Sequence, residues 1–233
     1  MAEILNLDYT AYVELVGTAH FTRRSIRDAY AAIADIHPRD LALELDWRRF
    51  CVLNTACLAC PHRVTCTGLC EFIAATDALG NVDANIWLID MTEQEMRRRI
   101  RSHRTPSERR PRSYPGYGEA VEGSRRLWER GRKEEVIRHS QRAIARHRRR
   151  FPSVWRVLLD ERNALMAVRL AWIASKNLQD EAASPILAFV GAAHVAGIRS
   201  LLQRPLRLRE TMRRLQLPFA EPTLIRRVAV HAA

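Results

Sequence analysis

The chain has 233 residues, of which 47% are hydrophobic, and its net charge is +12. Such a length and composition are enough for one substantial core, with room for a small extra module. No stretch is apolar and long enough to span a bilayer, and the N-terminus, with Glu3 and Asp8, lacks the basic-then-apolar pattern of a secretory signal. We therefore expect a cytoplasmic protein without a transmembrane segment.

The positive charge is almost entirely arginine, since the only lysines are Lys133 and Lys176. A basic balance ordinarily indicates nucleic acid or an acidic membrane surface as a partner. A skew toward arginine is also typical of a GC-rich genome, however. Nucleic-acid binding is therefore a less favoured alternative, although the basic surface does not exclude it.

One motif occurs near each end of the chain. Two apolar runs, Tyr12–Val16 and Ile186–Val190, each end in glycine, two small residues and a histidine, as Gly17-Thr18-Ala19-His20 and Gly191-Ala192-Ala193-His194. Continuous apolar runs are typical of strands in a covered parallel sheet, and ligands bind beyond the carboxyl ends of such strands. We predict that His20 and His194 meet at one site and hold a divalent metal.

The elements between these motifs alternate. A helical pattern at 23–36, which Thr22 caps and Pro38 ends, leads to a second strand at 41–46. A third strand is expected at 86–89 and a last, edge strand at 223–230. A strand-helix-strand order implies parallel pairing with a right-handed crossover.

We therefore expect an α/β fold with a central, mostly parallel sheet and flanking helices, forming one domain over residues 1–233. Apolar residues at helical spacing predict a helical insertion over 119–180. Residues 103–118 are rich in arginine, proline, serine and glycine, which predicts an exposed, flexible loop. A cysteine-rich metal loop completes the predicted architecture.

Acidic residues mark the end of the second strand. Glu44 interrupts its apolar run and Asp46 lies on the same face two residues later. A buried carboxylate needs a partner, which is either Arg48, Arg49 or a capping amide, or the metal bound by His20. We assign Glu44 to the metal site and Asp46 to substrate binding. Asp90, after the third strand, is predicted to cap the next helix together with Thr92.

The five cysteines all lie between residues 51 and 70, as Cys51, Cys57, Cys60, Cys66 and Cys70. In a reducing compartment such a cluster indicates a metal site rather than disulfides. Its spacing is more compact than that of a zinc ribbon, so a [4Fe–4S] cluster is slightly preferred to zinc. Free or buried thiols are the alternative.

These landmarks resemble the TraB/Tiki family, which includes the TraB and PrgY pheromone-shutdown proteins and the Tiki Wnt-cleaving proteases. The similar segments cover roughly residues 11–202 and are Leu15 to His20, Leu43 to Asp46, Gly68 to Phe72, Leu88 to Asp90, Glu161 to Asn163 and Val190 to His194. Many TraB relatives carry membrane helices after the second histidine motif, which this chain lacks, and the cysteine insert is not a general family feature.

The resemblance implies an α/β domain related to erythromycin-esterase-like and ChaN-like proteins. Tiki members are metal-dependent proteases that favour manganese or cobalt and require the two motif histidines and a glutamate. Carried over to this sequence, the required residues are His20, His194 and either Glu44 or Glu71.

The favoured function is a metal-dependent, peptidase-like hydrolase. Manganese, cobalt or zinc would lower the pKa of a bound water, and Glu44 or Glu71 would accept its proton as general base. Arg162 would stabilise charge on the substrate oxygen, and Asn163 would contact a peptide or small-molecule substrate.

Two alternatives remain open. One is a non-catalytic protein that binds a peptide, haem or a metal in the same pocket. The other is a redox-sensing or nucleic-acid-associated protein that uses the cysteines and the arginine surface. Assembly as a homo-oligomer is compatible with each of these functions.

Overall fold

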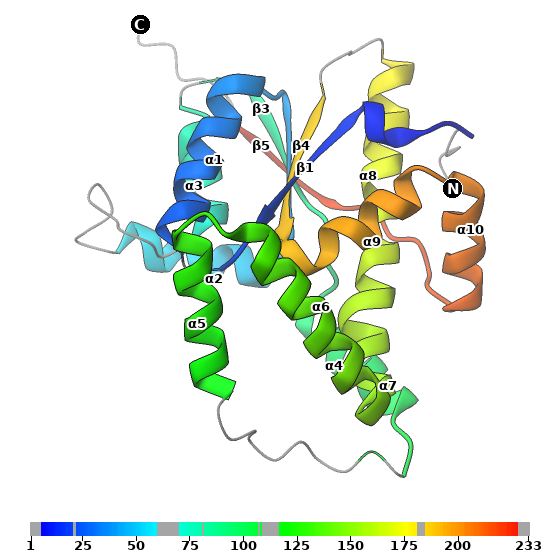
Figure 1. Ribbon diagram of the computed structural model, residues 1–233. Coiled ribbons are helices and arrows are strands. Elements are labelled where there is room, and N and C mark those ends of the chain that lie inside the picture. Colours follow the sequence, from blue (N-terminus) through cyan, green and yellow to red (C-terminus); the bar gives the residue numbers. More distant parts are fainter. Residues whose placement is uncertain are drawn as a thin grey trace, which may run out of the picture.

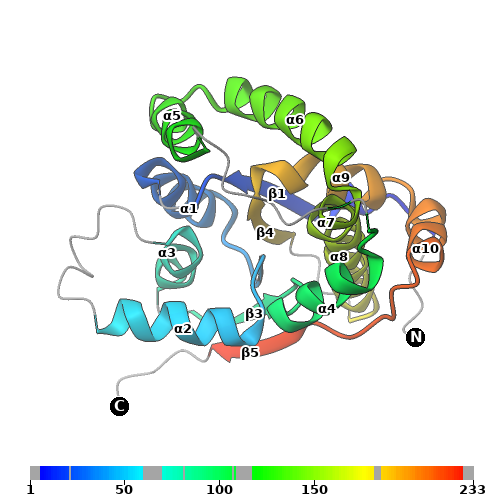
Figure 2. The ribbon, with the colours of Figure 1, turned by 90° about the horizontal axis from the view of Figure 1, so that it is seen from below.

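The computed structural model describes residues 6–20, 22–59, 70–80, 82–106, 108, 117–180 and 185–227. A five-stranded sheet of order β1-β4-β2-β3-β5 lies at its centre, with helices on both faces (Figures 1 and 2). The strands are β1 (Val13–Thr18), β2 (Asp40–Leu43), β3 (Ala84–Leu88), β4 (Ile186–Gly191) and β5 (Thr223–Arg227). Four strands are parallel, and β5 pairs antiparallel with β3. The predicted mostly parallel α/β sheet is confirmed.

Strand β4 joins the two ends of the chain. It lies between β1 and β2, with Gly191 in register with Thr18 and Phe189 in register with Leu43. Because these three strands are parallel, their carboxyl ends meet at one edge of the sheet. The residues that follow them are therefore brought together there.

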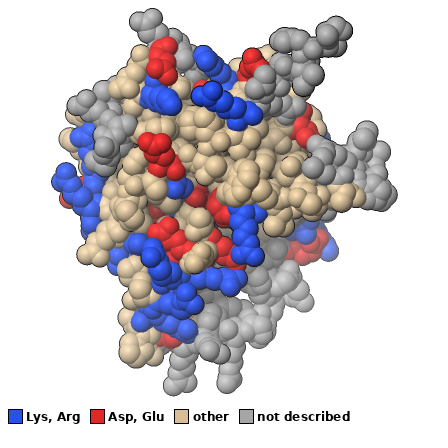
Figure 3. Space-filling model, turned by 180° about the vertical axis from the view of Figure 1, so that it is seen from behind, with Lys and Arg blue, Asp and Glu red and all other residues tan. Residues whose placement is uncertain are grey.

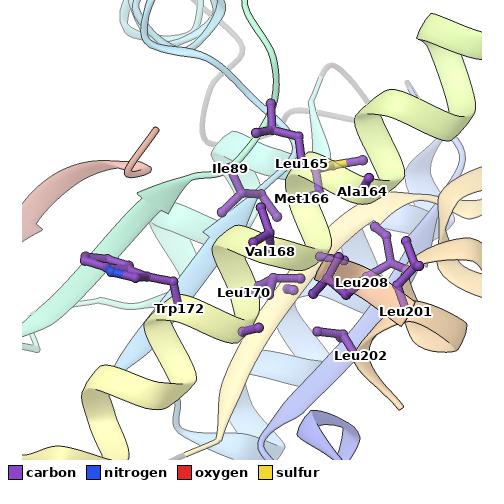
Figure 4. Packing of buried hydrophobic residues seen from close by; sticks show 14 of the residues in the cluster. Ile89, Ala164, Leu165, Met166, Val168, Leu170, Trp172, Leu201, Leu202 and Leu208 are labelled. Atoms are coloured by element: carbon purple, nitrogen blue, oxygen red, sulfur yellow. The ribbon is translucent and has the colours of Figure 1, made fainter. Parts of the chain in front are cut away.

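The alternation of side chains along β4 divides the core into two layers. Leu187 and Phe189 pack into one buried cluster with α1 (Arg23–Ile36) and α3 (Glu71–Ala78). Ile186, Ala188 and Val190 pack into the other, with α8 (Arg162–Gln179), α9 (Ala192–Leu202) and α10 (Pro205–Arg214). Figure 4 shows this second cluster, in which Leu165, Val168 and Leu170 of α8 lie near Leu201, Leu202 and Leu208. Helices therefore cover the sheet on both faces.

The other helices are α2 (Trp47–Leu58), α4 (Glu93–His103), α5 (Tyr117–Glu129), α6 (Lys133–Arg150) and the single turn α7 (Pro152–Trp155), with short turns η1 (Tyr9–Ala11) and η3 (Arg156–Glu161). Helices α4 to α7 lie beyond the carboxyl edge of the sheet and surround it when it is seen from below (Figures 1 and 2). Of the helical region expected over 119–180, α5 to α7 flank that edge, whereas α8 packs on one face of the sheet.

Local sequence signals explain the element boundaries. The Thr22 side chain accepts from the Ser25 amide and caps α1, as predicted. Strand β2 ends at Leu43, earlier than predicted, because the Leu45 amide bonds back to the Leu43 carbonyl at 2.7 Å. The chain then turns, so Asp46 caps α2 instead of extending the strand. The turn η3 is π-helical and leads directly into α8.

Two predicted segments fall largely outside the described residues. Of the cysteine-rich loop at 51–70, residues 60–69 are outside, and of the loop at 103–118, residue 107 and residues 109–116 are outside. Among the described residues, no helix is both long enough and apolar enough to cross a membrane.

Candidate functional site

His20 and Glu71 form a hydrogen-bonded pair at the carboxyl edge of the sheet. His20 follows β1, and its Nδ1 lies 2.6 Å from Oε1 of Glu71, the first residue of α3. A carboxylate only accepts, so Nδ1 donates the proton. Glu71 is 1% exposed and also accepts from the Thr18 hydroxyl at 3.0 Å, whereas the His20 side chain is 48% exposed. The buried acid thus orients a ring that solvent reaches.

The pairing shifts the ionisation of both groups. The hydrogen bond to Glu71 raises the pKa of His20, and burial of the ring opposes this only in part. Burial raises the pKa of Glu71, but the hydrogen bond and charge of His20 outweigh it, so the Glu71 pKa is lowered. Glu71 therefore remains a carboxylate and favours the protonated ring.

His194 sits in the first turn of α9 and is buried, with 5% of its surface exposed. Its Nδ1 lies 2.6 Å from Oδ1 of Asn163, and Arg162 donates to its Nε2 at 3.1 Å. An arginine cannot accept, so Nε2 is the acceptor and Nδ1 carries the proton. Burial lowers the pKa of His194, which is consistent with a neutral ring.

Arg162 connects the buried acids of the site. It donates to Oε1 of Glu44 at 2.5 Å and to Oδ1 and Oδ2 of Asp90 at 2.9 and 2.6 Å. Burial lowers the pKa of Arg162, but the two acids outweigh it and raise the pKa well above its usual range. Burial raises the pKa of Asp90, but Arg162 and Arg49 outweigh it and lower the pKa to about 2. The guanidinium therefore stays charged.

The two motif histidines and Glu44 converge around Gly191. Glu44 is 4% exposed, and its Oε2 accepts from the Gly191 amide at 2.5 Å. A Cβ at Gly191 would lie 3.4 Å from that oxygen, 3.6 Å from Nε2 of His20 and 3.6 Å from Cδ2 of His194. Glycine thus leaves space where the three side chains approach one another.

Asp46 pairs with Arg49, one of the two neighbouring arginines expected as its partner. It accepts from the Arg49 amide at 3.1 Å and from Arg49 Nε at 2.6 Å. Arg49 also donates to Asp90 at 2.6 Å, while Thr92 alone caps α4. The prediction that Asp90 helps to cap α4 is wrong, since this carboxylate pairs with two arginines. Its place directly after a buried strand at the same edge is the signal that could have identified it.

The side chains around Gly191 only partly fit a divalent metal. Two imidazoles whose Nδ1 atoms are bound by Glu71 and Asn163, together with a carboxylate, have the chemistry that such metals prefer. Arg162, however, donates to both His194 Nε2 and Glu44. Within the described residues, no group of three His, Cys, Asp or Glu side chains is arranged to hold a metal.

The cysteines among the described residues all come before Glu71 in the sequence. Cys51 and Cys57 are half-buried in α2, and Cys70 is buried immediately before α3. Burial raises the pKa of the Cys70 thiol to about 11. Cys60 and Cys66 lie outside the described residues, so the predicted cluster or zinc site stays a prediction.

The fold and site define an α/β protein in which paired strand-end histidines meet buried acids and an arginine at one edge of a parallel sheet. A family model for the TraB/PrgY/gumN family matches residues 84–206, and the chain belongs to this family. The matched segment contains Asp90, Arg162, Asn163 and His194. Comparisons with curated proteins and with solved structures find no match.

Proposed function

We propose that the protein is a peptidase-like hydrolase in which His20, positioned by Glu71, activates the attacking water. The observation that carries this proposal is the 2.6 Å bond between a half-exposed imidazole and a buried carboxylate at the carboxyl edge of the sheet. Membership of the TraB/PrgY/gumN family is compatible with it.

In this mechanism the neutral His20 ring accepts a proton from water at Nε2. Glu71 already holds Nδ1–H, so the ring keeps the required tautomer and orientation. The imidazolium that forms is stabilised by the adjacent carboxylate. The raised pKa makes His20 a stronger base than an isolated histidine.

Arg162 supplies fixed positive charge beside this base. The negative charge that develops on the substrate oxygen during hydrolysis is stabilised by preorganised positive groups in a site with little water. Glu44 and Asp90 hold the guanidinium in place, and His194 accepts from it. Asn163 keeps His194 in the tautomer that can accept.

A second candidate is the metal-dependent form of the same hydrolase. It is favoured by the bonds that occupy Nδ1 on both motif histidines, because second-shell acceptors of this kind orient metal ligands. His20, His194 and Glu44 would hold manganese, cobalt or zinc, and Arg162 would have to release His194 and Glu44. A bound metal would lower the pKa of water.

The test measures hydrolysis and metal content together. The full chain is purified, its metal content is determined, and cleavage of a fluorogenic peptide library is followed with chelator and with added Mn²⁺, Co²⁺ or Zn²⁺. We expect His20→Ala to abolish cleavage and Glu71→Gln to slow it roughly 100-fold, while His139→Ala, at an exposed position of α6, has no effect.

The outcomes separate the candidates. Cleavage that survives chelator supports His20 alone as the base, and cleavage restored only by metal, with metal lost in His194→Ala, supports the metal-dependent form. Tight peptide, haem or metal binding without cleavage under any condition would overturn the hydrolase in favour of a non-catalytic binder.

A further inference from the structure

A hollow of about 310 Å³ opens between the start of α2 and one side of α4. It is lined by Arg48, Glu93, Gln94, Arg97 and Arg101. Three of these five side chains are cationic. Arginine and acidic side chains gather together on the lower half of the face that carries α4 (Figure 3), so the pairing of each arginine decides what the hollow can bind.

The charges in the hollow do not balance. Arg97 pairs with Glu93 one turn earlier on α4. Arg48 and Arg101 are exposed, and neither has a carboxylate within ion-pair distance in the described part of the chain. Two guanidinium groups therefore face the hollow without an acidic partner, and each presents the forked donors that match a carboxylate.

The hollow adjoins the charge network of the site. Arg49, next to Arg48, donates to Asp90 and to the Met91 carbonyl, and Asp90 accepts from Arg162. The hollow thus lies at the opposite end of this chain of contacts from the histidines.

We propose that this hollow binds an acidic side chain of an extended peptide substrate. The peptide part of this inference rests on the proposed hydrolase function. That the bound side chain is acidic is inferred from Arg48 and Arg101. A single carboxylate fits better than a phosphate dianion, because the Glu93 carboxylate also lines the hollow and repels a second negative charge.

The test is binding, which requires no turnover. A blocked hexapeptide with one glutamate, its glutamine analogue and inorganic phosphate are each titrated into the full chain by calorimetry at low and high salt. We expect the glutamate peptide to bind more tightly than the glutamine peptide, with the difference reduced by salt. Arg48→Gln with Arg101→Gln should weaken glutamate-peptide binding about tenfold or more.

The matched control is Arg207→Gln with Arg213→Gln, which removes two exposed arginines from α10. Equal loss in both double variants would mean diffuse attraction to a basic protein and would overturn the proposal. Tight phosphate binding without discrimination between the peptides would overturn it as well. His20→Ala should bind the glutamate peptide like the wild type. If the hydrolase proposal is wrong, the wild type will bind this peptide without cleaving any peptide, so the two proposals can fail separately.

Discussion

Nδ1 of His20 lies 2.6 Å from Oε1 of Glu71, although the first follows β1 and the second begins α3. The acid is almost fully buried and the imidazole is half exposed. The pair thus places a fixed negative charge behind a ring that faces solvent. This arrangement makes the ionisation of His20 the most informative property to measure.

Glu71→Gln should lower the pKa of His20, because the negative charge that favours the protonated ring is removed while a neutral acceptor remains. In the proposed mechanism the neutral ring is the base, so the rising limb of the pH–rate profile should move to lower pH. The maximal rate should fall roughly 100-fold. NMR titration of the imidazole signals checks the shift in pKa. The control is Glu14→Gln, at an exposed position of β1. An unchanged His20 titration would contradict the pairing.

The same pair makes stability depend on pH. The pKa of His20 is raised above 6.5, so its contribution is fully present below that pH and is lost as pH rises through the raised value. The pKa of Glu71 is lowered below 4.5, so its contribution is lost as pH falls through that lowered value. Urea unfolding should therefore show Glu71→Gln to cost more near pH 6 than near pH 9.

Arg162→Met should destabilise the fold by about 3–5 kcal/mol, because it leaves Glu44 and Asp90 as buried carboxylates without this partner. Asp90 contributes stability above its ordinary pKa of 3.8, and this is lost as pH falls through about 2. Without Arg162 that loss should begin at higher pH. Acid unfolding followed by circular dichroism measures it.

The control for that substitution is Arg98→Met, which removes an exposed arginine paired with Glu95 at 3.6 Å. Exposed pairs contribute about 0–1 kcal/mol. If the two variants unfold alike, Arg162 does not carry the charge balance of the site.

Gly197→Ala should mainly affect stability, whereas Gly191→Ala should mainly affect the cleavage rate. In Gly197→Ala the new Cβ would lie 2.2 Å from Nδ2 of Asn163, so Asn163 must move away from His194 at a cost of about 1–3 kcal/mol. In Gly191→Ala the nearest atom is 3.4 Å away, so the stability of the fold should change by no more than about 1 kcal/mol while the space between the histidines is filled. Thermal unfolding and the cleavage rate together distinguish these effects. A Gly191→Ala protein with full activity would show that this space is not used.

Glu161→Gln should destabilise the turn that precedes Arg162. Glu161 is fully buried and accepts from Arg99 at 2.5 Å and from Arg156 at 2.9 Å. Removing its charge leaves Arg99, whose side chain is 12% exposed, without this partner, and should cost about 3 kcal/mol in urea unfolding. Glu122→Gln, on the exposed surface of α5, should cost less than about 1 kcal/mol.

Much of the fold followed from local sequence signals. Apolar runs identified the strands, and the Thr22 cap with a helical pattern gave the bounds of α1 as observed. The end of β2 was misplaced, because the apolar character of Leu45 continues after the backbone has turned. The order β1-β4-β2 was not predictable, since it depends on how helices far apart in the chain pack on the two faces.

The site was predicted in outline. Two equivalent motifs at strand ends indicated that His20 and His194 approach one another, and both lie beside Gly191. The distant partners of His20 and Asp90 were not predictable. Glu71 bonds to His20 across 51 residues and Arg162 bonds to Asp90 across 72, so no local pattern links them.

Strand β4 separates β1 from β2, and it comes from the last quarter of the chain. During synthesis the first 180 residues leave the ribosome before the strand that joins their two halves is available. At that stage Glu44 lacks the Gly191 amide, and Arg162 and Asn163 lack His194, so the arrangement around Gly191 is incomplete. The convergence of His20, Glu44 and His194 therefore forms only when the final segment inserts into the middle of the sheet.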